Sequence, residues 1–284
     1  MAITTTNGDE ALERVVARLG ELAGPDPGEL FGRAIRQSID EVLDGPRTGR
    51  WDFSQLEKTE KTYVGTKVEI VVRTSLGLER GPRFDLEIEG YGLDTKWAMG
   101  SVWQIPREAV NELCLCIGGL DQMTRFQVGV VRCAEEHLNA GENRDRKRTI
   151  SALGRAAMHF LVEPSPLPGN FVAEMDPEIR AEVMAERTIQ ARVATLFRRV
   201  PYTAIPRGAV ATVARTTGDP MRRLRQDTGA NDPLQGMRIL SAKYGKGIVE
   251  ALGHAPLEAN HFMAVSESDI EALPARVRRR LGLD

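Results

Sequence analysis

The chain has few cysteines and histidines, the residues on which structural zinc sites depend. Its 284 residues include three cysteines and four histidines. Cys114, Cys116 and Cys133 lie in apolar segments and lack the paired spacing of zinc fingers. We therefore expect three thiols buried in the core and no structural zinc ion.

The chain also lacks a long apolar run and a strong net charge. No stretch of 18 or more apolar residues occurs, and the N-terminus lacks the basic-then-apolar order of a signal peptide. This predicts a soluble, intracellular protein with no membrane partner. The net charge of −2 excludes a basic protein that coats nucleic acid over its whole surface, so any DNA contact must be local.

Hydrophobic periodicity predicts helices at the start of the chain. Apolar residues recur at intervals of three and four from Asp9 to Ala23, and again from Pro27 to Asp44-Gly45-Pro46, where glycine and proline break the pattern. The apolar stretch Val68–Val72 fits the end of a helix or a strand equally well. The length and the hydrophobic content of 42% suit two domains.

Strand patterns follow the helices. Phe84–Glu89 and Leu93–Trp97 alternate apolar and polar residues around Gly90-Tyr91-Gly92, which predicts a β-hairpin. Residues 111–118 and 126–133 are apolar runs typical of buried strands. We therefore predict an α/β (α+β) class for this half of the chain.

A proline-rich segment predicts the domain boundary. Residues 163–170 contain three prolines and one glycine, a composition that sustains neither a helix nor a central strand. We place a first domain at residues 1–162, a linker at 163–172 and a second domain at 173–284.

The predicted hairpin contains the first candidate catalytic residues. Asp94 and Lys96 lie two apart in a strand and so share a face. A loop at Gly90-Tyr91 would place Asp85 opposite Lys96 and Glu87 opposite Asp94. A cluster of three carboxylates favours binding of a divalent cation such as Mg²⁺. Together with a lysine, such a cluster suits phosphodiester hydrolysis. The alternative is a solvated strand face of alternating charge.

Several separated motifs resemble the NaeI restriction endonuclease family. They are Asp44–Trp51, Glu57–Thr62, Gly65–Ile70, the hairpin and Asn143–Arg148. The resemblance implies a first domain with a PD-(D/E)xK-type mixed sheet flanked by helices. It also implies an active site of Glu69, Asp85, Asp94 and Lys96, in which the three acidic residues hold one or two Mg²⁺ ions. No organic cofactor is implied.

The second half of the chain is basic. From Arg192 to Lys246 there are eleven Lys or Arg residues against three Asp. Residues 206–215, 216–219 and 220–225 have the spacing of a helix, a turn and a second helix that begins with proline. This pattern predicts a helix-turn-helix, although an arginine-rich surface helix would look the same. The expected DNA-binding residues are Arg207, Arg215, Arg222, Arg223, Arg225 and Lys243.

The resemblance extends these expectations to the whole protein. It implies a mainly helical, winged-helix-like second domain that binds another copy of the recognition sequence, which is type IIE behaviour. It further implies a bacterial cytoplasmic homodimer that binds double-stranded DNA, two duplexes per dimer, and cuts a GC-rich palindrome. The rival interpretations are a non-enzymatic helix-turn-helix regulator and a nuclease restricted to modified DNA.

Overall fold

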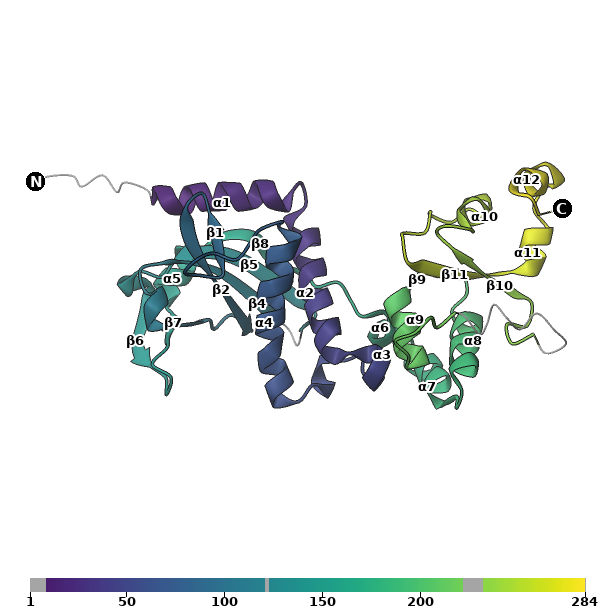
Figure 1. Cartoon of the computed structure of the whole chain (residues 1–284), viewed down its shortest axis with the longest axis horizontal. Helices are drawn as coiled ribbons and strands as arrows, with labels where there is room; N and C mark the ends of the chain where they lie inside the picture. Colours follow the sequence, from purple (N-terminus) through teal and green to yellow (C-terminus); the bar gives the residue numbers. More distant parts are fainter. Residues whose placement is uncertain (1–8, 121–122, 222–231, 284) are drawn as a thin grey trace, which may run out of the picture. The chain divides into compact units, whose positions relative to one another are not determined.

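The computed structural model describes residues 9–120, 123–221 and 232–283 and divides the chain into two compact units. Residues 1–42 and 56–169 form the first unit, while residues 43–55 and 170–284 form the second. The segment 43–55, which precedes α4 in the sequence, therefore belongs to the second unit (Figure 1).

Three long helices lie in the described part of the first unit, and two of them match the predicted ranges. They are α1 (Glu10–Ala23), α2 (Pro27–Leu43) and α4 (Lys58–Ser75). The side chain of Asp9 accepts a hydrogen bond from the Leu12 amide and caps α1. The ambiguous stretch Val68–Val72 is helical because Val64, Val68, Val71 and Val72 lie on one buried face of α4.

A five-stranded mixed sheet forms the core of this unit. Its order is β1-β2-β4-β5-β8, and only β2 and β4 are parallel neighbours. The strands are β1 (Leu86–Ile88), β2 (Tyr91–Met99), β4 (Leu113–Leu120), β5 (Arg125–Arg132) and β8 (His159–Pro166). The three cysteines are free and buried among these strands, as predicted. The mixed α+β class is confirmed.

The hairpin is present, but its predicted register is wrong. Its loop is Glu89-Gly90, and both residues have positive φ, 53° and 80°, as a two-residue hairpin turn requires. Leu86 therefore pairs with Leu93, and Glu87 pairs with Gly92 and is exposed. Asp94, rather than Lys96, is consequently the residue level with Asp85.

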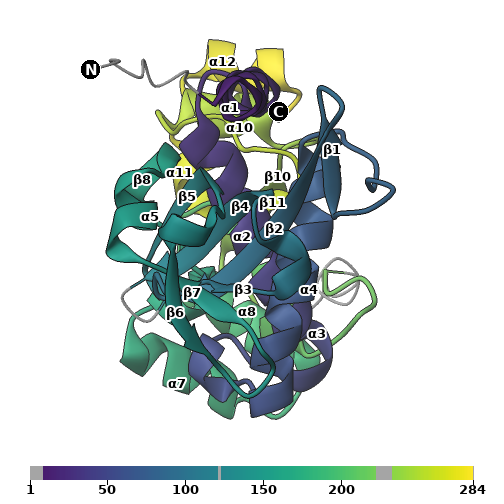
Figure 2. The ribbon, with the colours of Figure 1, turned by 90° about the vertical axis from the view of Figure 1, so that its left-hand side faces the viewer.

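A smaller sheet of order β3-β7-β6 lies beside the main sheet (Figure 2). Its strands are β3 (Gln104–Ile105), β6 (Leu138–Glu142) and β7 (Arg148–Ile150), and the short helix α5 (Ala152–Ala156) follows β7. Trp103, Ile105 and Leu138 pack with Ala98 and Cys116 of the main sheet. The tip between β6 and β7 is exposed.

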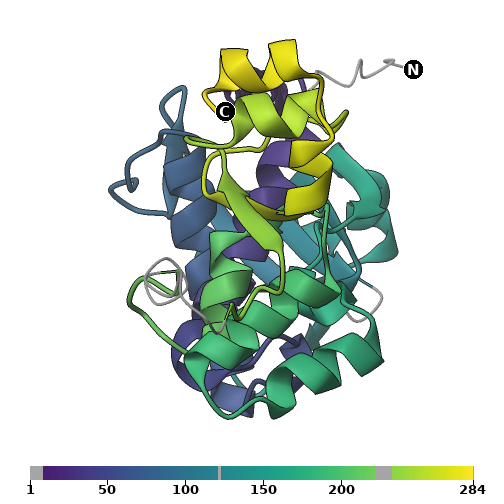
Figure 3. The ribbon, with the colours of Figure 1, turned by 90° about the vertical axis from the view of Figure 1, so that its right-hand side faces the viewer.

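Short helices and one antiparallel sheet make up the second unit (Figure 3). The sheet has the order β10-β11-β9, with strands β9 (Ile205–Pro206), β10 (Met237–Ser241) and β11 (His261–Ser266). The helices are α3 (Gly45–Thr48), α6 (Phe171–Glu174), α7 (Pro177–Ala185), α8 (Ile189–Arg199), α9 (Arg207–Ala214), α10 (Lys246–Ala251), α11 (Glu267–Glu271) and α12 (Ala275–Leu281). Mainly helical content is thus confirmed for this unit.

The first helix of the predicted helix-turn-helix is α9, which ends at Arg215 in the left-handed conformation. The predicted second helix, residues 220–225, falls largely on 222–231, outside the described residues. The predicted DNA-binding residues Arg222, Arg223 and Arg225 therefore also lie outside them.

Candidate active site

The site forms next to the first residue of β1, where β2 continues past β1 and one of its edges has no partner strand. Pairing between β1 and β2 extends only to Leu86 and Leu93. Beyond that point the carboxylate of Asp85 accepts a hydrogen bond from the amide of Thr95, with 2.9 Å between Oδ2 and N. A side chain thus takes the place of a missing strand, which positions the Asp85 carboxylate against β2.

Asp94 and Lys96 form an ion pair on this strand. Lys96 Nζ lies 2.7 Å from Asp94 Oδ2, and the two side chains are 21% and 10% exposed. Burial raises the pKa of Asp94, as does a hydrogen bond with the Asp85 carboxyl, while Lys96 lowers it; the net shift is upward. Burial alone would lower the pKa of Lys96, but Asp94 outweighs it, so Lys96 stays charged.

Glu69 joins these residues from α4. Its pKa is raised to about 7, first by burial and then by the negative charge of Asp85, while Lys96 opposes the shift and Asp94 adds to it. Because these charges act on one another, the four residues predicted from the sequence form one electrostatic cluster. The cluster combines residues from a helix, the residue before β1 and strand β2.

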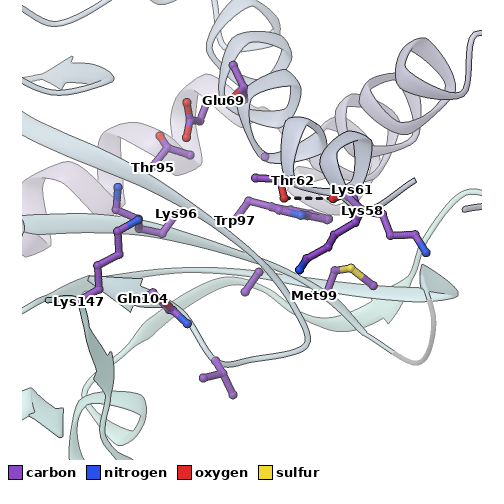
Figure 4. Close-up of a pocket in the computed structure, with 14 residues that line it drawn as sticks. Lys58, Lys61, Thr62, Glu69, Thr95, Lys96, Trp97, Met99, Gln104 and Lys147 are labelled. Atoms are coloured by element: carbon purple, nitrogen blue, oxygen red, sulfur yellow. Dashed lines mark hydrogen bonds between the residues drawn. The ribbon is translucent and has the colours of Figure 1, made fainter. Parts of the chain in front are cut away.

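A pocket of about 820 Å³ opens beside this cluster. Glu69 projects into it from α4, and Thr95 and Lys96 line it from the sheet (Figure 4). Lys58, Lys61 and Lys147 also line it. The sequence interpretation missed Lys58 and Lys61 as site residues, although their helical spacing from Glu69 would have placed them on its face. Lys147 lies in the Asn143–Arg148 motif of the family resemblance.

Asp85 and Asp94 are the carboxylates that could hold a divalent cation. Within the described residues, no three His, Cys, Asp or Glu side chains form a group able to hold a metal on their own. Asp85 and Asp94 instead offer a pair of carboxyl groups in hydrogen-bonding contact. Mg²⁺ characteristically takes one or two carboxylates and completes its shell with water and phosphate oxygens, so this pair fits it.

The raised pKa of Glu69 predicts a pH-dependent stability of the metal-free protein. Its pKa is about 7 in the folded state and about 4.5 unfolded, so its contribution is full below pH 4.5 and is lost as the pH rises through 7. The shift corresponds to at most about 3 kcal/mol, which partial exposure reduces. We expect Glu69→Gln to stabilise the protein by about 1 to 2 kcal/mol at pH 8 and to have little effect at pH 5.

Hydrogen exchange in the strands of the first unit, for both proteins at the two pH values and in the presence of a chelator, measures this difference. Glu87→Gln is the matched control, because Glu87 is exposed on β1 outside the cluster. A Glu69→Gln protein less stable than the wild type at pH 8 would show that folding does not raise the pKa of Glu69.

The remaining predicted DNA-binding residues lie in the second unit. Arg207 begins α9 and forms an ion pair with Asp219 at 3.6 Å. Arg215 is exposed and follows α9 with a φ of 52°. Lys243 is exposed, with its amine 5.0 Å from the ring centroid of Tyr244. Their exposure leaves all three side chains accessible to a ligand.

Comparisons with known proteins agree with a nuclease. A model of the restriction endonuclease NaeI family matches residues 13–272. The type II restriction enzyme NaeI of Lentzea aerocolonigenes is 37% identical over 235 residues, which are 80% of this chain and 73% of that relative. The protein is therefore a type II restriction endonuclease, a site-specific deoxyribonuclease that acts on double-stranded DNA.

The chain belongs to the NaeI restriction endonuclease family. Type II restriction endonucleases generally use a divalent metal ion. Within the described residues, no helix is long and apolar enough to cross a lipid bilayer. Family membership decides against the non-enzymatic regulator as an interpretation of this chain.

Proposed function

We propose that the protein is a Mg²⁺-dependent enzyme that hydrolyses both strands of DNA at a GC-rich palindrome. The Asp94–Lys96 ion pair at the free edge of β2 is the main support for the proposed metal site. Asp85 is hydrogen-bonded to β2 beside this pair, and the charges of all three residues act on Glu69. One lysine stays charged beside three acidic residues, a combination that suits a divalent cation and a phosphate group. This is a PD-(D/E)xK-type arrangement.

In this proposal each residue has a distinct task. Asp85 and Asp94 hold Mg²⁺, and Glu69 completes the acidic set from α4. When bound between these carboxylates, Mg²⁺ would supply Lewis-acid chemistry to the scissile phosphate and would make a neighbouring water more acidic. Lys96 stabilises the negative charge that develops on the phosphate oxygens and helps to orient the attacking water. Asp94 keeps Lys96 protonated and in place.

The second unit is proposed to bind DNA through a winged-helix-like, helix-turn-helix arrangement. Arg207 and Arg215 at the two ends of α9, together with Lys243, Arg222, Arg223 and Arg225, are its proposed contacts. We further propose a bacterial cytoplasmic homodimer, since a two-fold protein matches a palindrome, and a second duplex that acts as an effector. We propose that the first unit cuts DNA and that the second unit binds the effector. Of the predicted linker 163–172, residues 163–166 belong to strand β8 of the first unit.

Cleavage of a whole phage genome with purified protein and Mg²⁺ tests the proposal. We expect discrete fragments whose mapped ends share one GC-rich palindrome, and no cleavage with a chelator. Plasmids with one and two copies of the mapped site test the effector, because a second site should accelerate cleavage. Equal rates on both plasmids would contradict the type IIE part alone.

The same experiment distinguishes a nuclease restricted to modified DNA. Such an enzyme would cut methylated phage DNA and leave the unmodified genome intact. Intact DNA in every lane, with Mg²⁺ and with both substrates, would refute the proposed activity.

A further inference from the structure

The pocket beside the active site is strongly positive outside its catalytic residues. Lys58, Lys61 and Lys147 line it together with Lys96, while Glu69 is the only acidic residue of its lining in the described part of the chain. A protein of net charge −2 therefore concentrates positive charge at the place where the substrate strand must enter. The occupant that this charge favours is a polyanion.

Two of these lysines share one face of α4 with Glu69. Lys58 and Lys61 lie eleven and eight residues before Glu69, and Thr62, Gly65 and Thr66 of the same lining lie between them. A helix rises about 1.5 Å per residue, so Lys58 lies roughly 16 Å along the helix from Glu69. The residues of this lining that lie between Lys58 and Glu69 on α4, apart from Lys61, are small and uncharged.

Lys147 lies on another wall of the pocket, at the tip between β6 and β7 (Figure 4). The side chain of Asn143 shapes this tip, since its Oδ1 accepts hydrogen bonds from the amides of Asp145 and Lys147, each at 2.9 Å. The amide of Asn143 in turn bonds the Lys147 carbonyl at 2.9 Å. The backbone of Lys147 is thus held in position, while its side chain remains available to a ligand.

The side chains of Lys58 and Lys147 form no ion pair within the described residues. Lys67 provides the contrast on the same helix, because its amine lies 2.6 Å from the carboxylate of Glu41. An unneutralised lysine on each of two walls of one pocket is the pattern expected of phosphate contacts, which stay vacant until DNA binds.

We propose that Lys58 and Lys147 are positioning residues that bind backbone phosphates of the substrate strand on two walls of this pocket, with Lys61 between Lys58 and the active site. The proposal rests on the proposed function of the neighbouring cluster. Because Lys58 lies roughly 16 Å along α4 from Glu69, it contacts a phosphate a few nucleotides away from the scissile one. These contacts fix the register of the strand and carry no base specificity.

The test combines a salt titration with cleavage kinetics on the full-length protein. The probe is a short duplex with one mapped cleavage site, and Ca²⁺ replaces Mg²⁺ in the binding assay. For Lys58→Ala/Lys147→Ala we expect binding to weaken about tenfold or more on specific and nonspecific duplexes alike. The slope of log Kd against log salt should fall by roughly 0.9 per lost phosphate contact, nearly 2 in total. KM should rise much more than kcat falls.

Two further variants separate phosphate contacts from structural effects. Lys67→Ala removes a lysine from the same helix outside the pocket and should keep the wild-type slope. Lys58→Arg/Lys147→Arg retains both charges and should restore the slope. A wild-type slope and KM in the double alanine variant, while the wild type cleaves DNA, would overturn this inference alone. Failure of the wild type to cleave would instead refute the proposed function.

Discussion

Lys96→Ala should reduce the rate of DNA cleavage by about a thousandfold, and Asp94→Asn should reduce it by at least as much. Lys96 is ion-paired with the acidic cluster, its amine 2.7 Å from Asp94 Oδ2. Without it, the negative charge that develops on the phosphate loses its positive partner. The Asp94 pKa also rises further, because Lys96 is the group that opposes its upward shift. Less of the carboxylate is then ionised to hold a metal.

Single-turnover cleavage of a plasmid at saturating Mg²⁺ measures both effects. Glu87→Gln is the matched acidic control, since Glu87 is exposed one residue from buried Leu86 and Ile88 and should retain wild-type rates. Binding of the same DNA in Ca²⁺ verifies that the variants are folded and engage their substrate. If the Lys96→Ala enzyme cleaves DNA within about tenfold of the wild-type rate, Lys96 has no major role in catalysis.

Arg192→Ala should destabilise the second unit by about 3 to 5 kcal/mol. Arg192 lies on α8 and is only 8% exposed. Its Nε and Nη2 donate to the carbonyls of Val213 and Ala214 at 2.8 and 3.0 Å, and its Nη1 donates to the Glu186 carbonyl at 3.0 Å. Alanine would leave these carbonyls without donors, including the last two of α9.

Hydrogen exchange measures this loss within the second unit, because the global unfolding of a protein with two units has no single free energy. We expect amide protection in α8 and α9 to collapse while the strands of the first unit keep theirs. Arg199→Ala is the control on the same helix. Arg199 pairs with Glu182 at the surface, with both side chains 49% exposed, and its loss should cost less than about 1 kcal/mol. Equal amide protection in Arg192→Ala and Arg199→Ala would show that the buried hydrogen bonds of Arg192 do not stabilise the second unit.

The relation between sequence and site differs from residue to residue. Asp94 and Lys96 were predicted to share a face because alternation in a strand is a local property. Glu69 lay in a stretch for which helix and strand were equally plausible, and only the resemblance to a family assigned it to the site. Its position on α4 is decided by Val64, Val68, Val71 and Val72, which are buried on the opposite part of that helix.

The register of the hairpin shows why local patterns are insufficient. Either two-residue loop preserves the alternation of apolar and charged residues, but only a loop at Glu89-Gly90 pairs buried Leu86 with buried Leu93. Packing of these two side chains therefore brings Asp85 level with Asp94. A shift of two residues in the register would have kept every side chain on the same face but placed Lys96 level with Asp85 instead.

The sequence by itself determined the helices α1 and α2, the buried strands, the apolar environment of the three cysteines and the shared face of Asp94 and Lys96. These follow from periodicity and turn residues, which act over a few positions. Only the tertiary structure decided the contact between Asp85 and Thr95, the raised pKa of Glu69 and the placement of residues 43–55 in the second unit. Such features depend on groups far apart in the chain that burial brings together, and no local pattern records them.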